Sequence, residues 1–130
     1  ICAMIVDDIL STFHVKCCTD ENGGDTSDQI NSGRHVVGIP RLAYGTYLIP
    51  STAEGEAAVT AALARYRHLD CAPVYGNEIT IGRSILLSGV SRGKLFLTSK
   101  VWNTAQRSGR AAVRDSVLRS ICDLHGVGRE

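Results

Sequence analysis

From residue 41 onward, short apolar runs alternate with longer segments in which apolar residues recur at helical spacing. The run 42–46 predicts a short buried strand, and the next segment predicts a helix with one apolar face able to pack on a sheet. That face consists of Val59, Ala62, Leu63 and Tyr66. Two more units follow, with strands predicted at 67–70 and 95–99 and helices at 77–88 and after Ser108. The stripe of the last helix is Val113, Val117, Ile121 and Leu124.

Residues with special backbone or capping behaviour set the predicted helix ends. Pro50 and a Ser-x-x-Glu pattern that begins at Ser51 predict the start of the first helix. Gly89 is the expected stop of the second helix, Ser108 the expected N-cap of the third, and Gly126 its end. Strands and helices that alternate with this period favour an α/β fold with a parallel sheet.

The first thirty residues lack such a pattern. A short apolar patch leads into a cluster of turn-forming residues at 19–28, without helical or strand periodicity. We therefore predict that residues 1–30 form an irregular N-terminal arm and that the strand–helix units belong to residues 31–130.

Composition excludes several classes of partner. The 130 residues include 14 basic and 13 acidic side chains, and the net charge of +1 provides no basic face for nucleic acid and no polybasic stretch for a membrane surface. The apolar runs are far shorter than the ~18 residues of a membrane helix. The start of the chain lacks the positive segment of a signal peptide. We expect a cytoplasmic protein of undetermined oligomeric state.

The cysteines and histidines do not form a metal-binding pattern. No Cys-x-x-Cys spacing and no histidine pair at ligand intervals occurs, so we predict no metal site. The odd number of cysteines is typical of a reducing compartment. They are Cys2, Cys17, Cys18, Cys71 and Cys122. Cys71 is expected to be a small buried hydrophobe beside a strand end.

Three chemically active side chains fall at the ends of predicted parallel strands. Asp70 ends the second strand, Tyr75 lies in the loop after it, and Lys100 follows the third strand. A free tyrosine has a pKa of about 10 and is a reluctant acid near neutral pH. An ammonium about 4 Å away stabilises a phenolate by roughly 4 kcal/mol at an effective dielectric constant near 20. An aspartate paired with that lysine would keep the ammonium charged.

The segments Arg67-His68-Leu69-Asp70, Tyr75-Gly76-Asn77-Glu78 and Lys100-Val101-Trp102 resemble the signature of the aldo-keto reductases. The resemblance extends from about residue 31 to residue 126 and is greatest to the branch of aldose reductase, diketogluconate reductase and prostaglandin F synthase. It implies a (β/α)8 TIM barrel. Since such a barrel typically needs about 250 residues, the chain corresponds to the N-terminal half only, an incomplete barrel of about three βα units.

The resemblance also implies an activity and roles for particular residues. It implies NADPH-dependent reduction of aldehydes and ketones to alcohols, with a small carbonyl compound as substrate. Tyr75 would be the proton donor, tuned by Lys100 and Asp70. The cofactor would be bound by Gly45, Thr46, Asp70 and Lys100. The substrate pocket would include Tyr47, Val74 and Trp102.

Two readings remain open for the chain as a whole. In the family, a histidine in the fourth strand orients the carbonyl group, and no substitute for it is evident here. The leading hypothesis is therefore a reductase represented by its N-terminal half, inactive alone. The alternative is a non-catalytic truncated remnant, or a binding module that pairs with another chain through the unpaired edge of its last strand. Taken singly, Asp70, Tyr75 and Lys100 would more often be structural residues.

Overall fold

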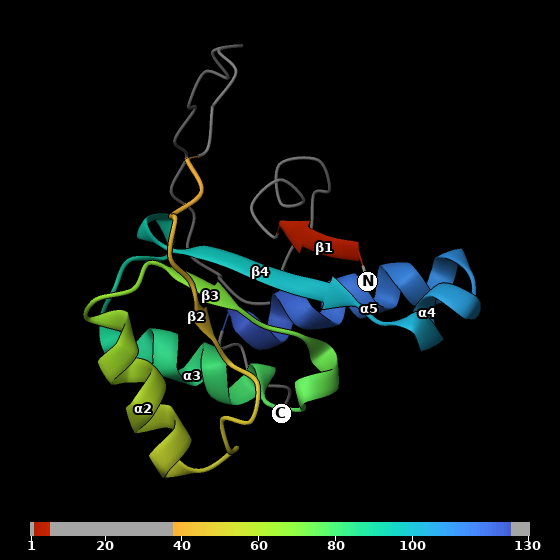
Figure 1. The fold of residues 1–130 in the computed structure, drawn as a ribbon. Coiled ribbons are helices and arrows are strands. Elements are labelled where there is room, and N and C mark those ends of the chain that lie inside the picture. Colours follow the sequence, from red (N-terminus) through yellow and green to blue (C-terminus); the bar gives the residue numbers. More distant parts are fainter. Residues whose placement is uncertain (1, 6–37, 126–130) are drawn as a thin grey trace, which may run out of the picture.

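A computed structural model describes residues 2–5 and 38–125 of the chain (Figure 1). Within these residues, four strands form one sheet in the order β1-β4-β3-β2. The strands are β1 (Cys2–Ile5), β2 (Tyr44–Gly45), β3 (His68–Asp70) and β4 (Phe96–Val101). The helices are α2 (Ala53–Leu63), α3 (Glu78–Ser88), α4 (Asn103–Arg107) and α5 (Arg110–Leu124), with two short 3-10 turns, η1 (Pro73–Tyr75) and η2 (Arg92–Lys94).

Strands β2, β3 and β4 are parallel neighbours, as the strand–helix pattern predicted. Leu69 of β3 lies opposite Tyr44 of β2 and Leu97 of β4, and Asp70 lies opposite Thr98. Because successive side chains of a strand point to opposite faces, this register fixes which residues of neighbouring strands share a face. The three predicted strand–helix units are therefore confirmed in their order and direction.

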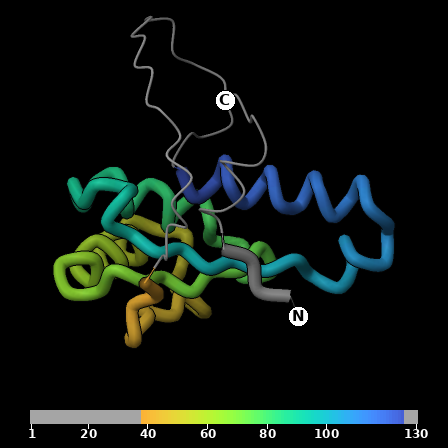
Figure 2. The backbone as a smooth tube through the Cα atoms, turned by 90° about the horizontal axis from the view of Figure 1, so that it is seen from above, coloured from red at the N-terminus to blue at the C-terminus, as the bar shows by residue number. Residues whose placement is uncertain are grey.

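The hydrophobic core lies between one face of this sheet and helices α2, α3 and α5. Leu69 and Leu97 point into it and are fully buried. Figure 2 shows α5 running alongside β4. The helices supply Val59, Leu63, Ile81, Ile85, Ile121 and Leu124. The opposite face, here called the site face, carries the side chains that alternate with the two leucines: His68, Asp70, Thr98 and Lys100.

The first strand is shorter and more exposed than predicted. Only Tyr44–Gly45 pairs with β3, and Leu42 is 74% exposed, so the prediction of a buried strand over 42–46 was wrong in extent. The reason is position, since β2 has a neighbouring strand on one side among the described residues. Thr46 is nevertheless buried beyond the strand, and its backbone N–H donates to the Asp70 carbonyl oxygen at 3.0 Å.

The ends of α2 and α3 follow local chemistry. Thr52, not Ser51, is the N-cap of α2, and its hydroxyl accepts from the Gly55 N–H at 3.5 Å. The Ser51 hydroxyl instead donates to the Gly76 carbonyl oxygen at 3.2 Å. Gly89 ends α3 with a φ of 65°, the left-handed conformation that glycine adopts without strain, so that predicted stop is confirmed.

The third helical region is divided, which the sequence pattern did not predict. Ser108 is the C-terminal cap of the extra helix α4, and its hydroxyl donates back to the Thr104 carbonyl oxygen at 2.8 Å. Gly109, with a φ of 93°, then starts α5. The prediction of Ser108 as an N-cap was therefore wrong, and α5 ends at Leu124 with His125 as its cap. Gly126 lies outside the described residues.

Strand β1 corrects two expectations about the start of the chain. It pairs antiparallel with β4, with Cys2 opposite Val101 and Ile5 opposite Thr98. Residues 2–5 are thus not irregular, and the edge of β4 beyond β3 is not unpaired. A sheet edge presents free N–H and C=O groups, so an apolar segment can add to it as a strand. The rest of the predicted arm, residues 6–30, lies outside the described residues.

Candidate active site

The site begins with the pairing of β3 and β4. Asp70 and Lys100 share the site face because Asp70 lies opposite Thr98, two positions before Lys100. The Lys100 Nζ donates to Asp70 Oδ1 at 2.7 Å and to the Cys71 carbonyl oxygen at 2.8 Å. The lysine side chain is 16% exposed and the aspartate side chain 40%. The predicted lysine–aspartate pair is therefore present, with the carboxylate on its more accessible side.

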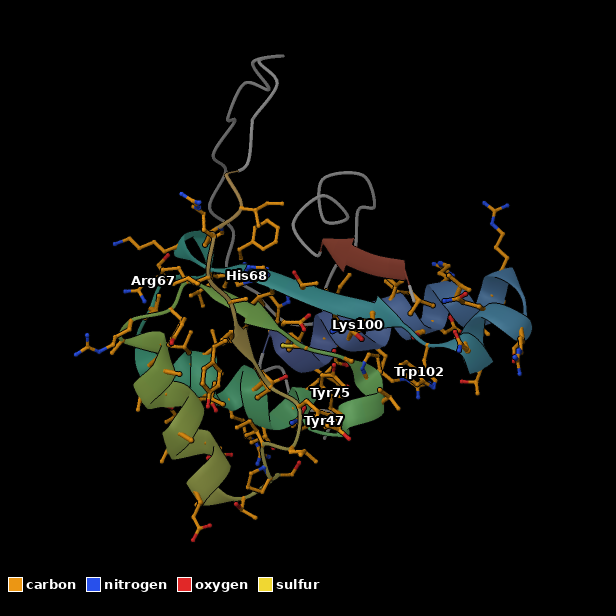
Figure 3. All side chains as sticks on the ribbon, viewed as in Figure 1. Tyr47, Arg67, His68, Tyr75, Lys100 and Trp102 are labelled. Carbon is orange, nitrogen blue, oxygen red and sulfur yellow. The ribbon has the colours of Figure 1, made fainter. Side chains whose placement is uncertain are left out.

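A short 3-10 turn brings Tyr75 to this pair. Pro73 begins η1 and Gly76 ends it with a φ of 69°, so the chain reverses within a few residues of Asp70. The Lys100 Nζ lies 5.2 Å from the centroid of the Tyr75 ring. Figure 3 shows Tyr75 and Lys100 near one end of the sheet, with Tyr47 beside the tyrosine. The structure thus brings Asp70, Tyr75 and Lys100 together.

The surroundings of Lys100 favour its charged form. Partial burial by itself lowers the pKa of Lys100, but hydrogen bonding to Asp70 and the attraction of Tyr75 and Asp70 outweigh it, so the pKa is raised above its usual value. A cation held in this way is a permanent source of positive potential beside the tyrosine.

Gly45 and Thr46 differ in their access to the site. Gly45 is exposed, and a Cβ added there would meet nothing within 4 Å. Thr46 is fully buried, and its hydroxyl donates to the Asp70 carbonyl oxygen at 3.0 Å. Gly45 therefore borders open space, whereas the Thr46 side chain fixes the end of β3.

The three predicted pocket residues form two groups. Tyr47 is 65% exposed, and its ring centroid lies 5.1 Å from that of Tyr75 at an interplanar angle of 58°. Val74 and Trp102 instead line a cavity of about 540 Å³, together with residues of α4 and α5. Tyr47 is not among the residues that line this cavity. Tyr75 thus has the Tyr47 ring beside it, and its neighbour Val74 lines a separate cavity whose other walls include polar and charged residues.

Three features of the site region were not predicted. Leu48 has a φ of 65° although it is not glycine, a conformation that costs roughly 1–2 kcal/mol. Asn77, the first residue of the helix predicted over 77–88, donates from its side chain to two backbone carbonyl groups of the loop after β2. Glu78 is a buried carboxyl group. A glutamate in the first turn of a helix is ordinarily a surface residue attracted by the helix dipole, so no sequence signal indicated this burial.

Cys71 and His68, which lie close to Asp70 in the sequence, are both engaged in contacts within the protein. Cys71 is fully buried in the core as expected, and burial raises the pKa of its thiol to about 12. His68 is half-buried, with its Nε2 2.8 Å from the Thr98 hydroxyl and its ring in a T-shaped contact with Phe96. Among the described residues, no cluster of His, Cys, Asp and Glu could hold a metal ion, and no helix there is long and apolar enough to cross a membrane.

Comparison with known proteins identifies the family. The model of the aldo/keto reductase family matches residues 41–126, which contain β2, β3 and β4 together with Asp70, Tyr75 and Lys100. The chain belongs to the aldo/keto reductase family. An aldehyde reductase of Saccharomyces cerevisiae is 38% identical over 91 residues, which are 70% of this chain and 28% of that protein. The chain thus spans less than a third of the length of this relative.

Solved aldo/keto reductases share the arrangement of the described residues. An enzyme from Brucella melitensis is 41% identical with a TM-score of 0.60, over 66% of this chain and 33% of that one. An aldo-keto reductase from Bombyx mori, solved in complex with NADP, is 34% identical with a TM-score of 0.57, over 66% of this chain and 31% of that one. The predicted fold class is therefore confirmed: the described residues are part of a (β/α)8 barrel fold, with three of its parallel strands.

Proposed function

We propose that this chain carries the proton-donating segment of an NADPH-dependent aldo-keto reductase, which reduces aldehydes and ketones to alcohols. The observation that carries the proposal is the position of one ammonium group. Lys100 is bonded to Asp70 and to the Cys71 carbonyl while its Nζ lies 5.2 Å from the Tyr75 ring centroid. The known activity of the Saccharomyces cerevisiae relative as an aldehyde reductase supports the same reaction class.

Reduction of a carbonyl group needs a hydride at carbon and a proton at oxygen. Tyr75 donates its hydroxyl proton to the carbonyl oxygen, which would otherwise become an alkoxide. The Lys100 cation, with its Nζ 5.2 Å from the ring centroid, attracts the negative charge that Tyr75 gains when it gives up its proton. Asp70 keeps Lys100 charged and directed toward the tyrosine. General acid catalysis of this kind contributes roughly 10²–10⁴-fold to a rate.

The residues at this end of the sheet leave room for a cofactor. Gly45 borders open space, and the Asp70 carboxylate is partly exposed beside Lys100. We propose that Gly45, Thr46, Asp70 and Lys100 would hold the nicotinamide end of NADPH, with Thr46 acting through its hold on β3. When bound, NADPH supplies the hydride, which no side chain can provide. The Bombyx mori relative, solved with NADP, supports this choice of cofactor.

The apolar groups around Tyr75 suit a small carbonyl substrate. The Tyr47 ring flanks the proton donor, and Val74 and Trp102 line the adjacent cavity. Apolar walls with a few polar groups at one end are typical of sites for small molecules. We therefore propose that the substrate lies with its carbonyl oxygen at Tyr75 and its apolar part against these walls.

The 130 residues alone are expected to reduce aldehydes negligibly. Of the described histidines, His68 lies on the site face two positions before Asp70 and already contacts Thr98 and Phe96, and His125 caps α5. Among the described residues, a carbonyl group would therefore have a proton donor but no evident second group to orient it.

The proposal is tested in a chimeric enzyme, in which residues 41–126 replace the matching segment of the Brucella melitensis reductase. NADPH oxidation is followed with 4-nitrobenzaldehyde as substrate. Tyr75→Phe should lower kcat by roughly 10²–10⁴-fold because the proton donor is lost, with NADPH affinity retained. Tyr44→Phe is the matched control, because Tyr44 packs against Tyr66 away from the site and the variant should keep most of the activity. A folded chimera that is inactive, or a fully active Tyr75→Phe chimera, would contradict the proposal.

A further inference from the structure

The loop after β2 contains a strained turn. The Ile49 N–H donates to the Thr46 carbonyl oxygen at 3.2 Å and closes the turn 46–49. Leu48, in its third position, has a φ of 65° and is the only non-glycine residue with positive φ in the described part of the chain. That conformation normally requires glycine or asparagine. The Leu48 side chain is 79% exposed, so packing of this side chain does not hold the turn in place.

The side chain of Asn77, at the start of α3, is hydrogen-bonded to this turn. Its side-chain Nδ2 donates to the Thr46 carbonyl oxygen and to the Ile49 carbonyl oxygen, both at 2.9 Å. Asn77 is 2% exposed, so both bonds are shielded from water. The two amide hydrogens thus reach the two carbonyl groups at the ends of the turn. A flipped amide would place its oxygen against both carbonyl oxygens, so the orientation of the group is fixed by its surroundings.

The turn carries Tyr47, and Asn77 follows Tyr75 by two residues. The Tyr47 and Tyr75 ring centroids are 5.1 Å apart (Figure 3). Asn77 therefore connects the two segments that present these rings. We infer that Asn77 is a positioning residue that holds Tyr47 against Tyr75 and thereby fixes the aromatic wall beside the proton donor. The role of that wall rests on the proposed function, whereas the placement of the rings does not.

A simpler role for Asn77, as a cap of α3, does not account for its side chain. Asn77 occupies the N-cap position, but its side chain makes no capping hydrogen bond to the helix. The helix uses its backbone instead, since the Ile81 N–H donates to the Asn77 carbonyl oxygen at 3.0 Å. Both donors of the side chain are directed to the turn. A residue that served α3 alone would not need an amide here.

The test uses NMR of the 130-residue chain with labelled tyrosine rings, so it does not depend on enzymatic activity. Ring-to-ring NOEs are expected between Tyr47 and Tyr75 and between Tyr44 and Tyr66, whose centroids are 5.6 Å apart. Asn77→Asp removes both donors and turns a carboxylate toward two carbonyl oxygens. It should abolish the Tyr47–Tyr75 NOE while the Tyr44–Tyr66 NOE stays. Asn103→Asp, the same change at an exposed position of α4, should leave both NOEs unchanged.

Two further measurements keep the inference decidable if Asn77→Asp fails to fold. In the unaltered chain, both Asn77 Hδ2 protons should exchange with solvent more than tenfold more slowly than those of Asn103. In the double variant Leu48→Gly/Asn77→Asp, glycine accepts the positive φ, so the Tyr44–Tyr66 NOE should return without the Tyr47–Tyr75 NOE. Rapid exchange of the Asn77 side-chain protons, or a folded Asn77→Asp chain with both NOEs at full intensity, would overturn the inference. A failure of the chimeric reductase would not affect either measurement.

Discussion

The two faces of β4 differ in the charged groups that they contact. On the site face, the Lys100 ammonium bonds to Asp70 and to the Cys71 carbonyl oxygen. On the helix-covered face, the neighbouring Ser99 donates to a Glu78 carboxyl oxygen at 2.6 Å, and Ser120 of α5 donates to the other at 2.9 Å. One face thus holds a charged pair near solvent, and the other joins a sheet and two helices through a buried carboxyl group.

The pKa values of Lys100 and Glu78 are both raised, but this favours the charged form of the lysine and the neutral form of the glutamate. Hydrogen bonding and charge attraction raise the pKa of Lys100 against the effect of burial, so the charged form is the stabilised one. Burial raises the pKa of Glu78, against the hydrogen bonds from Ser99 and Ser120, so the neutral form is favoured. The charge of Lys100 is preserved because a carboxylate bonds to it, whereas burial moves the Glu78 carboxyl group toward its neutral form although two hydroxyl groups donate to it.

The largest effect expected from this contrast is on catalysis. In the chimeric reductase, Lys100→Met should lower kcat by roughly 10²-fold or more, because the phenolate of Tyr75 loses its cation. Glu78→Gln should retain most of the activity, because it changes a group on the other face. Steady-state NADPH oxidation measures both variants. Equal losses of kcat in the two variants would contradict the view that only the site face of β4 contributes to catalysis.

The next effect concerns stability. Glu78→Ala should lower the free energy of unfolding of the 130-residue chain by about 2–4 kcal/mol, because it leaves the Ser99 and Ser120 hydroxyl groups buried without an acceptor and opens a cavity. Glu78→Gln should cost less than about 1 kcal/mol, because its amide can still bond to both hydroxyl groups. Urea denaturation followed by the fluorescence of Trp102 measures the change. A Glu78→Ala variant as stable as Glu78→Gln would show that the hydrogen bonds from Ser99 and Ser120 do not contribute as described.

A smaller effect is the pH dependence of stability, and it has the same sign for both groups. The folded-state pKa of Glu78 is raised from 4.5, so its contribution is greatest below pH 4.5 and decreases as the pH rises through the folded value. For Lys100, the contribution is present below pH 10.5 and is lost as the pH rises through its raised value. The urea midpoint should therefore contain a contribution that decreases as the pH rises from 4 to 8. This contribution should disappear in Glu78→Gln and persist in Lys100→Met.

The smallest expected effect is at the surface. The Arg83 guanidinium lies 3.8 Å from the Glu56 carboxylate, and the Arg83 side chain is 63% exposed. Such pairs typically contribute 1 kcal/mol or less. Arg83→Ala should therefore change the urea midpoint of the chain only slightly. A loss as large as that of Glu78→Ala would show that solvent exposure is not what separates the strong charge contacts from the weak ones.

The sequence predicted the strand–helix units and the grouping of Asp70, Tyr75 and Lys100 because both depend on local patterns. Val59 and Leu63 at helical spacing indicated the buried face of α2, and both are fully buried. Asp70 and Lys100 were placed together because parallel strands end at one edge of a sheet. These inferences need only the period of each element and the direction of its chain.

The remaining features depend on partners that are distant in sequence. Thr52 rather than Ser51 caps α2 because the Ser51 hydroxyl is bound to Gly76. Glu78 is buried because Ser99 and Ser120 meet it there. Strand β1 forms on an edge that only the assembled sheet provides. No pattern within one segment contains this information, so the sequence alone could not have predicted these features.

The bonds around Lys100 have one further consequence for the proposed reduction of aldehydes. An unprotonated lysine amine condenses with an aldehyde to form a Schiff base, which would block a site of this kind. Fewer than about one in a thousand ordinary lysines are unprotonated at neutral pH, and the raised pKa of Lys100 lowers that fraction further. Two of its hydrogens are also bonded to Asp70 and the Cys71 carbonyl. The contacts that keep Lys100 a cation beside Tyr75 would thus also keep its amine from reacting with an aldehyde bound at the proposed site.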